Sequence, residues 1–377
     1  MEPKQGLGCL NMLTWLMNCI LLSFQDEISK FQISNNAFIY PTNSRSRWLY
    51  IFDAYKIAKK IIHNSPFIIH NSLITCQDPF ETGLAGWLVA KKFKLPLQLQ
   101  IHTDVFSPYF RKESFLNKLR VFLAKFLIKR ANCLRVVSER IKKSVLRVTR
   151  YLPAGHAYRQ AGRHGGLRVT ILPIFVDAKK IQQAPITVDL HRKYPQFDFI
   201  ILMASRLTKE KNIKMAIEAM REIVKKHPKT GLIIVGSGPE EKNLKSQISN
   251  LKINENVKIE PWIDQLISYY KTADLFLLTS NYEGYARTVI EAMAAGCPVI
   301  MTDVGIAGEL LRNKSNGLVI PVGDVKALCQ AMLTLIHDKA LRYNLIAAAE
   351  RGIGHKLITK EQYLKQYLSS WHLCATS

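Results

Sequence analysis

Short continuous runs of apolar residues alternate with amphipathic segments along the second half of the chain. Residues 199–207 (FIILMASRL) form one run, and helical periodicity follows at 213–226. The apolar runs return at 231–235, 274–280 and 297–303. Buried strands that alternate with helices indicate a parallel sheet covered on both faces. We therefore predict a Rossmann-like domain over residues 189–355.

The first half follows the same alternation less regularly. Helical patterns at 47–62 and 81–93 precede the apolar strand LPLQLQIHTD and one long basic helix, and a further strand lies at NCLRVVS. We predict a second α/β domain over residues 1–175 and a proline-punctuated linker at 176–188. Residues 356–377 are expected to form a helix that packs back across the domain junction.

Two features bear on where the protein resides. Residues 7–24 are apolar but contain Gly8, Asn11, Thr14 and Asn18, and they fall short of the roughly 20 apolar residues of a membrane span. We interpret them as a core helix or strand, with a signal-anchor as the alternative. The seven cysteines show no metal-like spacing, which favours reduced thiols and a cytoplasmic protein.

The charge is strongly one-sided, with 53 Lys and Arg against 29 Asp and Glu and a net charge of +24. Nucleic acid, an anionic membrane or a phosphorylated substrate would each complement it. A nucleic-acid-binding protein needs aromatic and basic residues interleaved on a sheet or a groove-reading helix, and neither is visible. The basic segment 111–143 suits either an anionic bilayer or a core helix with a solvated basic face.

Cations and glycines follow the predicted strands of the second domain. Arg206 and Lys211 come after the first strand, and Gly236 and Gly238 follow the next. Ligands bind at the carboxyl ends of such strands, and these groups suit a diphosphate. Each also has an ordinary interpretation: a loop charge in solvent, or a G-x-G turn whose longer motif is broken at Glu241.

The stretch from Ser280 to Asp303 carries two carboxylates, Glu283 and Glu291. Glu283 lies in a loop just after an apolar strand and precedes Gly284, where backbone can approach a ligand closely. A carboxylate beside an anion site is explained if it accepts hydrogen bonds from hydroxyls, so a nucleotide sugar would satisfy both groups. Glu291 could instead close a capping box with Thr288.

These motifs, taken in order, resemble glycosyltransferase family 4, whose members are retaining enzymes of GT-B architecture. The segments are ASRLTKEKN, LIIVGSGPE, SNYEGYARTVIEAMAAGCPVIMTDVGIAGELL and NGLVIPVGD. The likeness covers the last half strongly, while LITCQDPFETGLAGWLVAKK, LQIHTD and LPIFVD agree more loosely. The resemblance implies a GT-B fold with two Rossmann-like domains facing across a cleft, the first on the acceptor side.

The resemblance also implies roles for the matching residues. Glu283 would contact the donor sugar's hydroxyls and Glu291 the ribose, while Arg206 and Lys211 would hold the diphosphate. His102 would lie near the transferred sugar, although a satisfied histidine at a strand end is the alternative. The expected pocket lining is Gly284, Tyr285 and the backbone amides near Thr288 and Val289, together with Gly236 and Gly238.

The chain departs from the family pattern at two places. Gly6 and Gly8 have no strand before them, which predicts an altered or shortened N-terminus, and Ile174 and Phe175 stand where the family commonly has Asn-Gly. No D-x-D sequence occurs in the chain, and such a pair holds the divalent ion in metal-dependent enzymes of the other main architecture. We expect no metal and no cofactor.

The sequence thus predicts a retaining glycosyltransferase that moves a sugar from a nucleotide-diphosphate sugar to a glycan or lipid-linked acceptor. It would act in the cytoplasm, peripherally on the inner face of the cell membrane. A nucleotide-sugar epimerase of the same architecture is the nearer alternative, and a basic nucleic-acid-binding protein the more distant one.

Overall fold

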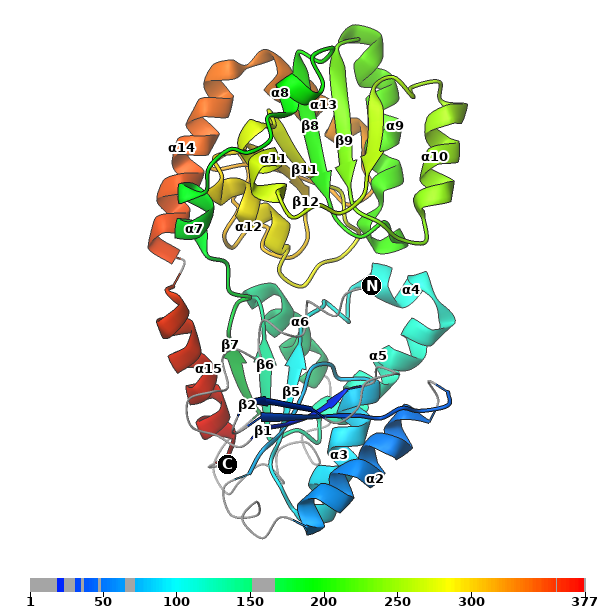
Figure 1. Cartoon of the computed structure of the whole chain (residues 1–377), viewed down its shortest axis with the longest axis vertical. Coiled ribbons are helices and arrows are strands. Elements are labelled where there is room, and N and C mark those ends of the chain that lie inside the picture. Colours follow the sequence, from blue (N-terminus) through cyan, green and yellow to red (C-terminus); the bar gives the residue numbers. More distant parts are fainter. Residues whose placement is uncertain are drawn as a thin grey trace.

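The computed structural model describes residues 19–23, 31–34, 37–46, 49–64, 72–150, 167–356 and 358–375. It contains two α/β domains, one above the other in Figure 1, which confirms the predicted fold class. Gly6, Gly8 and residues 151–166 lie outside the described residues, as does most of the apolar segment 7–24. Within that segment, Cys19–Ser23 is a strand.

The upper domain in Figure 1 contains a six-stranded parallel sheet in the order β10-β9-β8-β11-β12-β13. Its strands are β8 (Phe199–Ala204), β9 (Thr230–Val235), β10 (Val257–Glu260), β11 (Leu275–Leu278), β12 (Val299–Thr302) and β13 (Leu318–Ile320). Its helices are α8 (Leu190–Lys193), the 3-10 helix η2 (Lys209–Lys211), α9 (Ile213–Lys226), α10 (Glu241–Asn250), α11 (Leu266–Thr272), α12 (Arg287–Ala294), α13 (Val325–His337) and α14 (Lys339–Lys356).

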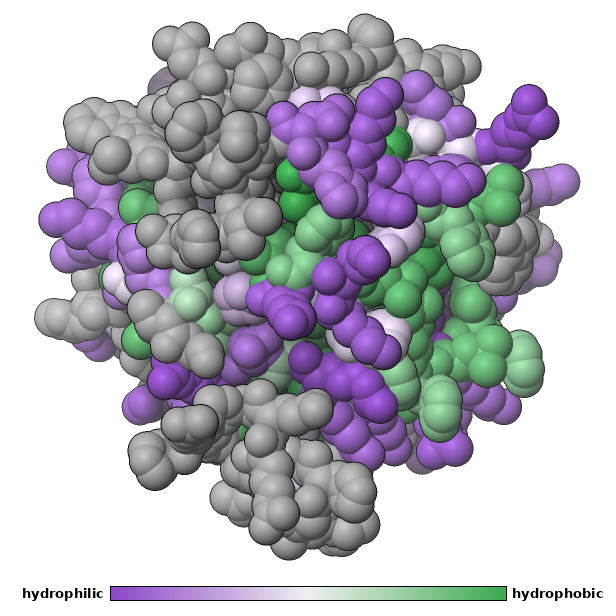
Figure 2. All heavy atoms as spheres, turned by 90° about the horizontal axis from the view of Figure 1, so that it is seen from below, coloured by the Kyte–Doolittle hydropathy of each residue, from purple (hydrophilic) through white to green (hydrophobic). Residues whose placement is uncertain are grey.

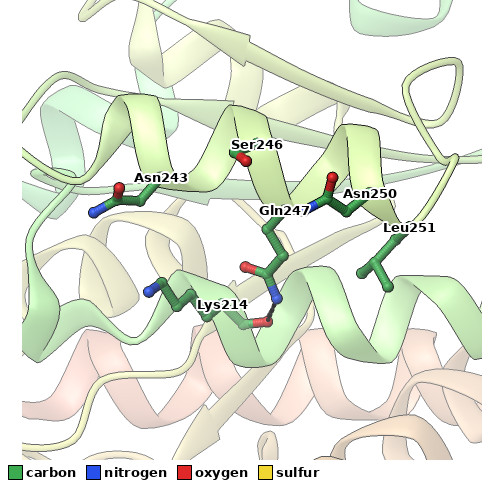
Figure 3. Close-up of a pocket in the computed structure, with 6 residues that line it drawn as sticks. All are labelled: Lys214, Asn243, Ser246, Gln247, Asn250 and Leu251. Atoms are coloured by element: carbon green, nitrogen blue, oxygen red, sulfur yellow. Dashed lines mark hydrogen bonds between the residues drawn. The ribbon is translucent and has the colours of Figure 1, made fainter.

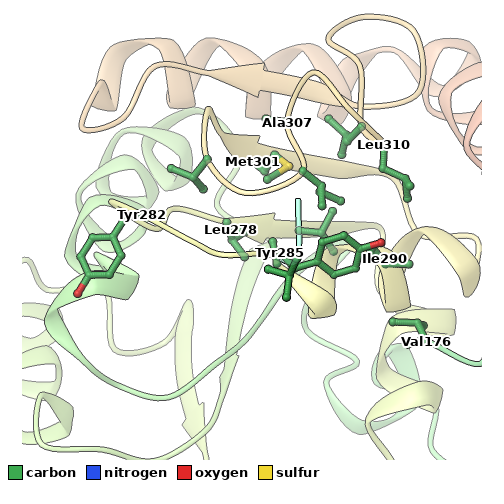
Figure 4. Packing of buried hydrophobic residues seen from close by; sticks show 14 of the residues in the cluster. Val176, Leu278, Tyr282, Tyr285, Ile290, Met301, Ala307 and Leu310 are labelled. Carbon is green, nitrogen blue, oxygen red and sulfur yellow. The ribbon is translucent and has the colours of Figure 1, made fainter. Parts of the chain in front are cut away.

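Alternate residues of β8 enter two different cores, because neighbouring side chains of a strand point to opposite faces of the sheet. Ile201 and Met203 pack with the apolar faces of α9, α10 and α13. Ile200 and Leu202 pack with α11 and α12. Figure 4 shows part of this second core, where Leu278, Ile290 and Met301 meet. The sheet is therefore covered on both faces, as its continuous apolar strands predict.

The lower domain contains a parallel sheet in the order β4-β5-β6-β7 and a smaller sheet in the order β1-β3-β2. The strands are β1 (Cys19–Ser23), β2 (Phe31–Ser34), β3 (Ala37–Pro41), β4 (Ile74–Cys76), β5 (Leu97–Ile101), β6 (Cys133–Val136) and β7 (Arg168–Ile171). The helices are α2 (Tyr50–His63), α3 (Glu81–Phe93), α4 (Pro108–Glu113), α5 (Phe115–Ile128) and α6 (Glu139–Arg150).

The single long basic helix predicted before β6 is wrong. Ser114 has an extended backbone and divides the segment into α4 and α5. Its side chain accepts a hydrogen bond from the Asn117 N–H at 3.1 Å, which satisfies one of the free donors at the start of α5. The apolar periodicity continues across this break, so the pattern alone did not reveal it.

The predicted linker contains a short helix, α7 (Ala178–Gln183), which packs against α12. Asp177 begins it by accepting a hydrogen bond from the Lys180 N–H at 3.0 Å. Beyond α14, helix α15 (Lys360–Ala375) lies beside the lower domain in Figure 1. The Gln98 amide on β5 donates to the carbonyl of Ser370 at 3.1 Å. None of the helices described has the length and apolar composition needed to cross a bilayer.

Candidate functional site

Glu283 and Lys211 form an ion pair at the carboxyl edge of the upper sheet. Lys211 ends η2 after β8, and Glu283 lies in the loop after β11. The Lys211 Nζ is 2.5 Å from the Glu283 Oε1, which also accepts a hydrogen bond from the Ser280 hydroxyl at 2.7 Å. The two charged side chains are only 17% and 12% exposed. A cation and a carboxylate therefore lie close enough together to contact the same ligand.

Hydrogen bonds hold the two loops that carry this pair in fixed positions relative to each other. The Thr279 hydroxyl donates to the carbonyls of Lys211 and Asn212, each at 3.0 Å. The Asn281 N–H donates to the Glu210 carbonyl at 2.8 Å. These bonds connect the end of β8 to the end of β11, so the ion pair rests on the backbone of two adjacent strands.

Glu291 lies on α12 and is held by two side chains. Its Oε1 is 2.7 Å from the Arg287 Nε, and its Oε2 accepts from the Tyr270 hydroxyl at 3.3 Å. The capping-box alternative is wrong, because α12 begins at Arg287 and Ala286 is its N-cap residue. Thr288 therefore lies inside the helix. The Glu291 carboxylate is 16% exposed and remains reachable from solvent.

Arg206 and the glycine turn lie beside the ion pair without touching it. The Arg206 guanidinium is exposed and 3.3 Å from the Glu210 carboxylate. A Cβ on Gly236 would collide with the Ser205 carbonyl, and one on Gly238 with the backbone of Leu207. Both glycines are thus explained by the close packing of two loops, and this packing accounts for them without a ligand.

The loop that carries Glu283 also touches the lower domain. The Ser138 hydroxyl, at the end of β6, donates to the Gly284 carbonyl at 3.0 Å. A Cβ on Gly284 would collide with the carbonyl oxygen of His102, at the end of β5. Only glycine lets the two domains approach this closely. The structure thereby brings His102 next to the residue that follows Glu283.

His102 is held as a neutral imidazole. Its Nε2 is 3.2 Å from the Gln100 Oε1, so this nitrogen carries the proton when it bonds to that acceptor. Burial, with a contribution from the positive charge of Arg135, lowers the pKa of His102 from 6.5 to about 4. The neutral ring can donate or accept a hydrogen bond, but at pH 7 it carries no charge to offset a leaving phosphate.

Three further residues of the expected pocket lining belong to the loop after Glu283 and to the first turn of α12. The Tyr285 ring is buried in the core shown in Figure 4, and burial raises the pKa of its hydroxyl. The Val289 side chain is fully buried, and its N–H donates to the Ala286 carbonyl at 3.0 Å. Thr288 is half-buried in the first turn of α12. The Tyr285 and Val289 side chains therefore support the loop from behind.

A hollow elsewhere on the upper domain is not part of this site. It has a volume of about 330 Å³ and opens between α9 and α10 (Figure 3). The Gln247 amide donates to the Lys214 carbonyl at 3.2 Å within it. Its lining consists of Lys214, Asn243, Ser246, Gln247, Asn250 and Leu251. No carboxylate lines this hollow, whereas the site described above contains Glu283 and Glu291.

The family model described as Glycosyl transferases group 1 matches residues 191–352. These residues form a group 1 glycosyltransferase domain. The matched segment contains the ion pair of Lys211 and Glu283 together with Glu291 and the glycine turn, and the predicted resemblance is confirmed at the level of the group 1 glycosyltransferases.

Two relatives extend the comparison. The poly(glycerol-phosphate) α-glucosyltransferase of Bacillus subtilis is 32% identical over 147 residues, which cover 39% of this chain and 22% of that protein. The UDP-Gal:α-D-GlcNAc-diphosphoundecaprenol α-1,3-galactosyltransferase of Escherichia coli is 25% identical over 326 residues, covering 82% of this chain and 76% of that protein. The chain thus spans less than a quarter of the first relative's length.

The fold as a whole is similar to that of HepE from Anabaena, solved in complex with UDP and glucose. The TM-score is 0.70 at 19% identity, over 89% of this chain and 86% of that chain. At this identity the likeness concerns the fold alone. Because it extends over both domains, the architecture is GT-B.

Sequence reasoning missed several contacts of the group 1 glycosyltransferase domain. Ser138 follows β6. Ligands bind at the carboxyl ends of parallel strands, and the same expectation for the strands of the first domain would have identified Ser138. Arg287 stands four residues before Glu291, a spacing at which helical side chains pair. Tyr270 gives no such signal, because its contact with Glu291 depends on how α11 packs against α12.

Proposed function

We propose that the protein transfers a sugar from a nucleoside diphosphate sugar to an acceptor, with retention of anomeric configuration. The observation that carries this proposal is the partly buried pair of Lys211 and Glu283 at the cleft edge, next to His102 of the other domain. A diphosphate needs a cation, and a sugar needs an acceptor for its hydroxyl hydrogen bonds. A donor that contains both needs these two groups within a few ångströms of each other. The group 1 glycosyltransferase domain supports the same assignment.

Each residue has a distinct part in the proposed reaction. Lys211, with Arg206 from the adjacent loop, neutralises the diphosphate as the glycosidic bond to it breaks. Glu283 accepts hydrogen bonds from the donor's hydroxyls, and Ser280 keeps its carboxylate in place. Glu291 holds the ribose, because Arg287 and Tyr270 fix its orientation. His102 offers an uncharged ring beside the transferred sugar.

The first test of the proposal is donor binding. Melting temperature is measured with nucleoside diphosphates in turn, since a ligand at 100 times its Kd stabilises by about 2.7 kcal/mol. One diphosphate should raise the melting temperature while its nucleoside does not. If no nucleotide shifts the transition, the assignment fails.

The second test is transfer itself. We expect a nucleotide-diphosphate sugar to be consumed only when a hydroxylated acceptor is present. Donor turnover without an acceptor would favour the epimerase alternative. Because Lys211 and Arg206 can neutralise the diphosphate, we further propose that transfer needs no divalent ion. Activity that is lost with excess chelator and restored by magnesium would contradict this part.

The acceptor we propose is a glycan or a lipid-linked saccharide used in polysaccharide or glycolipid assembly. The E. coli relative is named for a diphosphoundecaprenol-linked acceptor, and the net charge of +24 suits an anionic surface. We accordingly propose that the protein works in the cytoplasm, peripherally on the inner face of the membrane. Supplying the same saccharide with and without its lipid tests this, and we expect the lipid-linked form to have the lower KM.

A further inference from the structure

Helix α5 exposes large apolar side chains on the face that it turns away from the core. Phe115, Leu119 and Phe122 are 73%, 50% and 74% exposed. Their spacing places them on one side of the helix, while Val121 and Leu127 on the opposite side are buried. The helix therefore has two apolar sides and packs only one of them. An exposed apolar cluster of this kind marks an interaction site.

The exposed side of α5 is also basic. Lys118, Lys125 and Lys129 are exposed on it, and the sequence of α5 contains no Asp or Glu. The remaining cation of the helix, Arg120, is paired with Glu81 at 2.8 Å. We define the outer face of α5 as Phe115, Lys118, Leu119, Phe122, Lys125 and Lys129.

Two neighbouring helices continue this surface. Helix α3 packs between α5 and α2, and α2 exposes Phe52. The exposed lysines of the two helices are Lys56, Lys59, Lys60, Lys91 and Lys92. Asp53 accepts a hydrogen bond from the Ser44 hydroxyl at 2.6 Å, so this carboxylate is engaged. Figure 2 shows apolar residues gathered on the side of the domain where these helices lie, with hydrophilic residues among them.

The outer face of α5 begins close to the cleft. Glu113, two residues before Phe115, accepts a hydrogen bond from the Tyr282 hydroxyl at 2.7 Å. Tyr282 directly precedes Glu283 and also contacts the Phe110 ring of α4, with 5.4 Å between ring centroids. The start of the outer face of α5 therefore lies close to the candidate site.

We propose that the outer face of α5 docks the protein on an anionic lipid bilayer. Phe115, Leu119 and Phe122 would enter the boundary between headgroups and acyl chains, and the lysines would contact lipid phosphates. The charge on this face complements an anionic headgroup and repels a second copy of itself. The inference rests on the proposed function in one respect: a lipid-linked acceptor would then be presented at the cleft rim.

The test is flotation of the full chain with vesicles of phosphatidylglycerol and phosphatidylcholine, compared with phosphatidylcholine alone. Binding should require the anionic lipid and weaken as salt rises. The triple variant Lys118→Gln, Lys125→Gln, Lys129→Gln should bind about 100-fold more weakly, from the contribution of each lysine near a charged surface. Its matched control is Lys226→Gln, Lys242→Gln, Lys326→Gln, which removes the same charge from the other domain and should bind like wild type.

The apolar contribution is tested separately with Phe115→Gln, Phe122→Gln. These residues are exposed, and glutamine favours a helix, so the melting temperature should not change. We expect at least tenfold weaker vesicle binding, while the exposed pair Ile186→Gln in the linker and Tyr343→Gln in the other domain should have no effect.

Three outcomes would overturn the proposal: no vesicle binding by the wild type, equal loss in the matched controls, or face variants that bind like wild type. The rival occupant of this face is a second copy of the chain, and sedimentation of the same variants tests for it. If the variants dissociate a dimer without losing vesicle binding, the face is a dimer interface. Nucleoside diphosphate binding is measured in parallel. Failure of nucleotide binding alone would count against the proposed function and leave the docking result standing.

Discussion

Glu283 and Glu291 differ in what holds them, and the difference predicts separable effects. Glu283 is paired with Lys211 beside the position proposed for the donor sugar. Glu283→Gln should therefore lower kcat about tenfold or more, because a charge-assisted hydrogen bond contributes about 1.5–3 kcal/mol. Affinity for the free nucleoside diphosphate should change little, since that ligand lacks the sugar. Steady-state kinetics and calorimetry together check this.

Glu291→Gln should behave in the opposite way. A ribose contact acts equally in the ground and transition states, so the variant should lose about tenfold in nucleotide affinity with a smaller change in kcat. Glu241→Gln on α10, where the carboxylate is 40% exposed and paired with Lys245, is the control and should resemble wild type. Equal losses of nucleotide affinity in the Glu283 and Glu291 variants would contradict the division of roles.

His102 predicts a stability that depends on pH. Its pKa is about 4 in the folded protein and 6.5 by ordinary value, so between these values the unfolded chain binds a proton that the folded chain does not. Stability should then fall as pH drops from 6.5 to 4, by at most about 3 kcal/mol from this group. His102→Gln should flatten that part of the profile, measured by urea unfolding across this window. An unchanged slope would mean that other groups cause the acid sensitivity.

For single residues, the sequence predicted which charged side chains lie at the strand ends better than it predicted which residues those side chains contact. Lys211 and Glu283 each follow an apolar strand, so the strand-end rule placed them at one edge. The side chains of Tyr285 and Val289 are buried, and the pocket lining by Tyr285 and by the amides near Thr288 and Val289 stays a prediction. The contact between Gly284 and His102 joins residues far apart in the chain, and no local pattern encodes it.

Helix α15 is connected to the lower domain through a buried cation. The Arg135 guanidinium donates to the hydroxyls of Tyr363 at 3.0 Å and Tyr367 at 3.3 Å and to the Gln100 Oε1 at 2.5 Å. These partners are neutral oxygens, and Arg135 is 3% exposed. Removing one hydroxyl leaves the buried charge less well satisfied, which is costly in a region that water does not reach.

We expect Tyr367→Phe to lower the free energy of unfolding by about 1–3 kcal/mol. Denaturant melts measure the change. Tyr343→Phe is the control, because that ring is largely exposed and its change should stay within about 0.5 kcal/mol. If the free energy of unfolding of the Tyr367 variant falls no more than that of the control, the Arg135 cluster does not hold α15 in place.

Element types followed from the hydrophobic period, while their boundaries depended on single polar residues. The predicted helix at 213–226 is confirmed as α9, since its apolar residues recur with a clear helical period. Ser114 divided one predicted helix into two, and Asp177 started a helix inside the predicted linker. A cap of this kind acts through one hydrogen bond of a single residue. The hydrophobic period is averaged over many residues and does not reveal it.

For the whole molecule, Arg140 of α6 connects the two domains directly. Its guanidinium forms an ion pair with the Asp303 carboxylate and donates to the carbonyls of Gly305 at 3.3 Å and Ala307 at 3.1 Å. Close by, the Glu139 N–H donates to the Glu309 carboxylate at 3.0 Å. Gly305 packs directly against Glu283, so these contacts hold the loop of Glu283 against the lower domain.

Arg140→Met should therefore separate the domains without unfolding either. It keeps much of the side-chain stem but removes the ion pair and the hydrogen bonds to the two carbonyls, so we expect a larger radius of gyration by small-angle scattering and a drop in kcat of about tenfold or more. Nucleoside diphosphate affinity should be nearly unchanged, because the proposed donor groups Lys211, Arg206 and Glu291 all belong to the upper domain. Lys143→Met, an exposed position on the same helix, is the matched control. A variant that loses nucleotide affinity but keeps its scattering profile would show that Arg140 acts on the donor and not on domain closure.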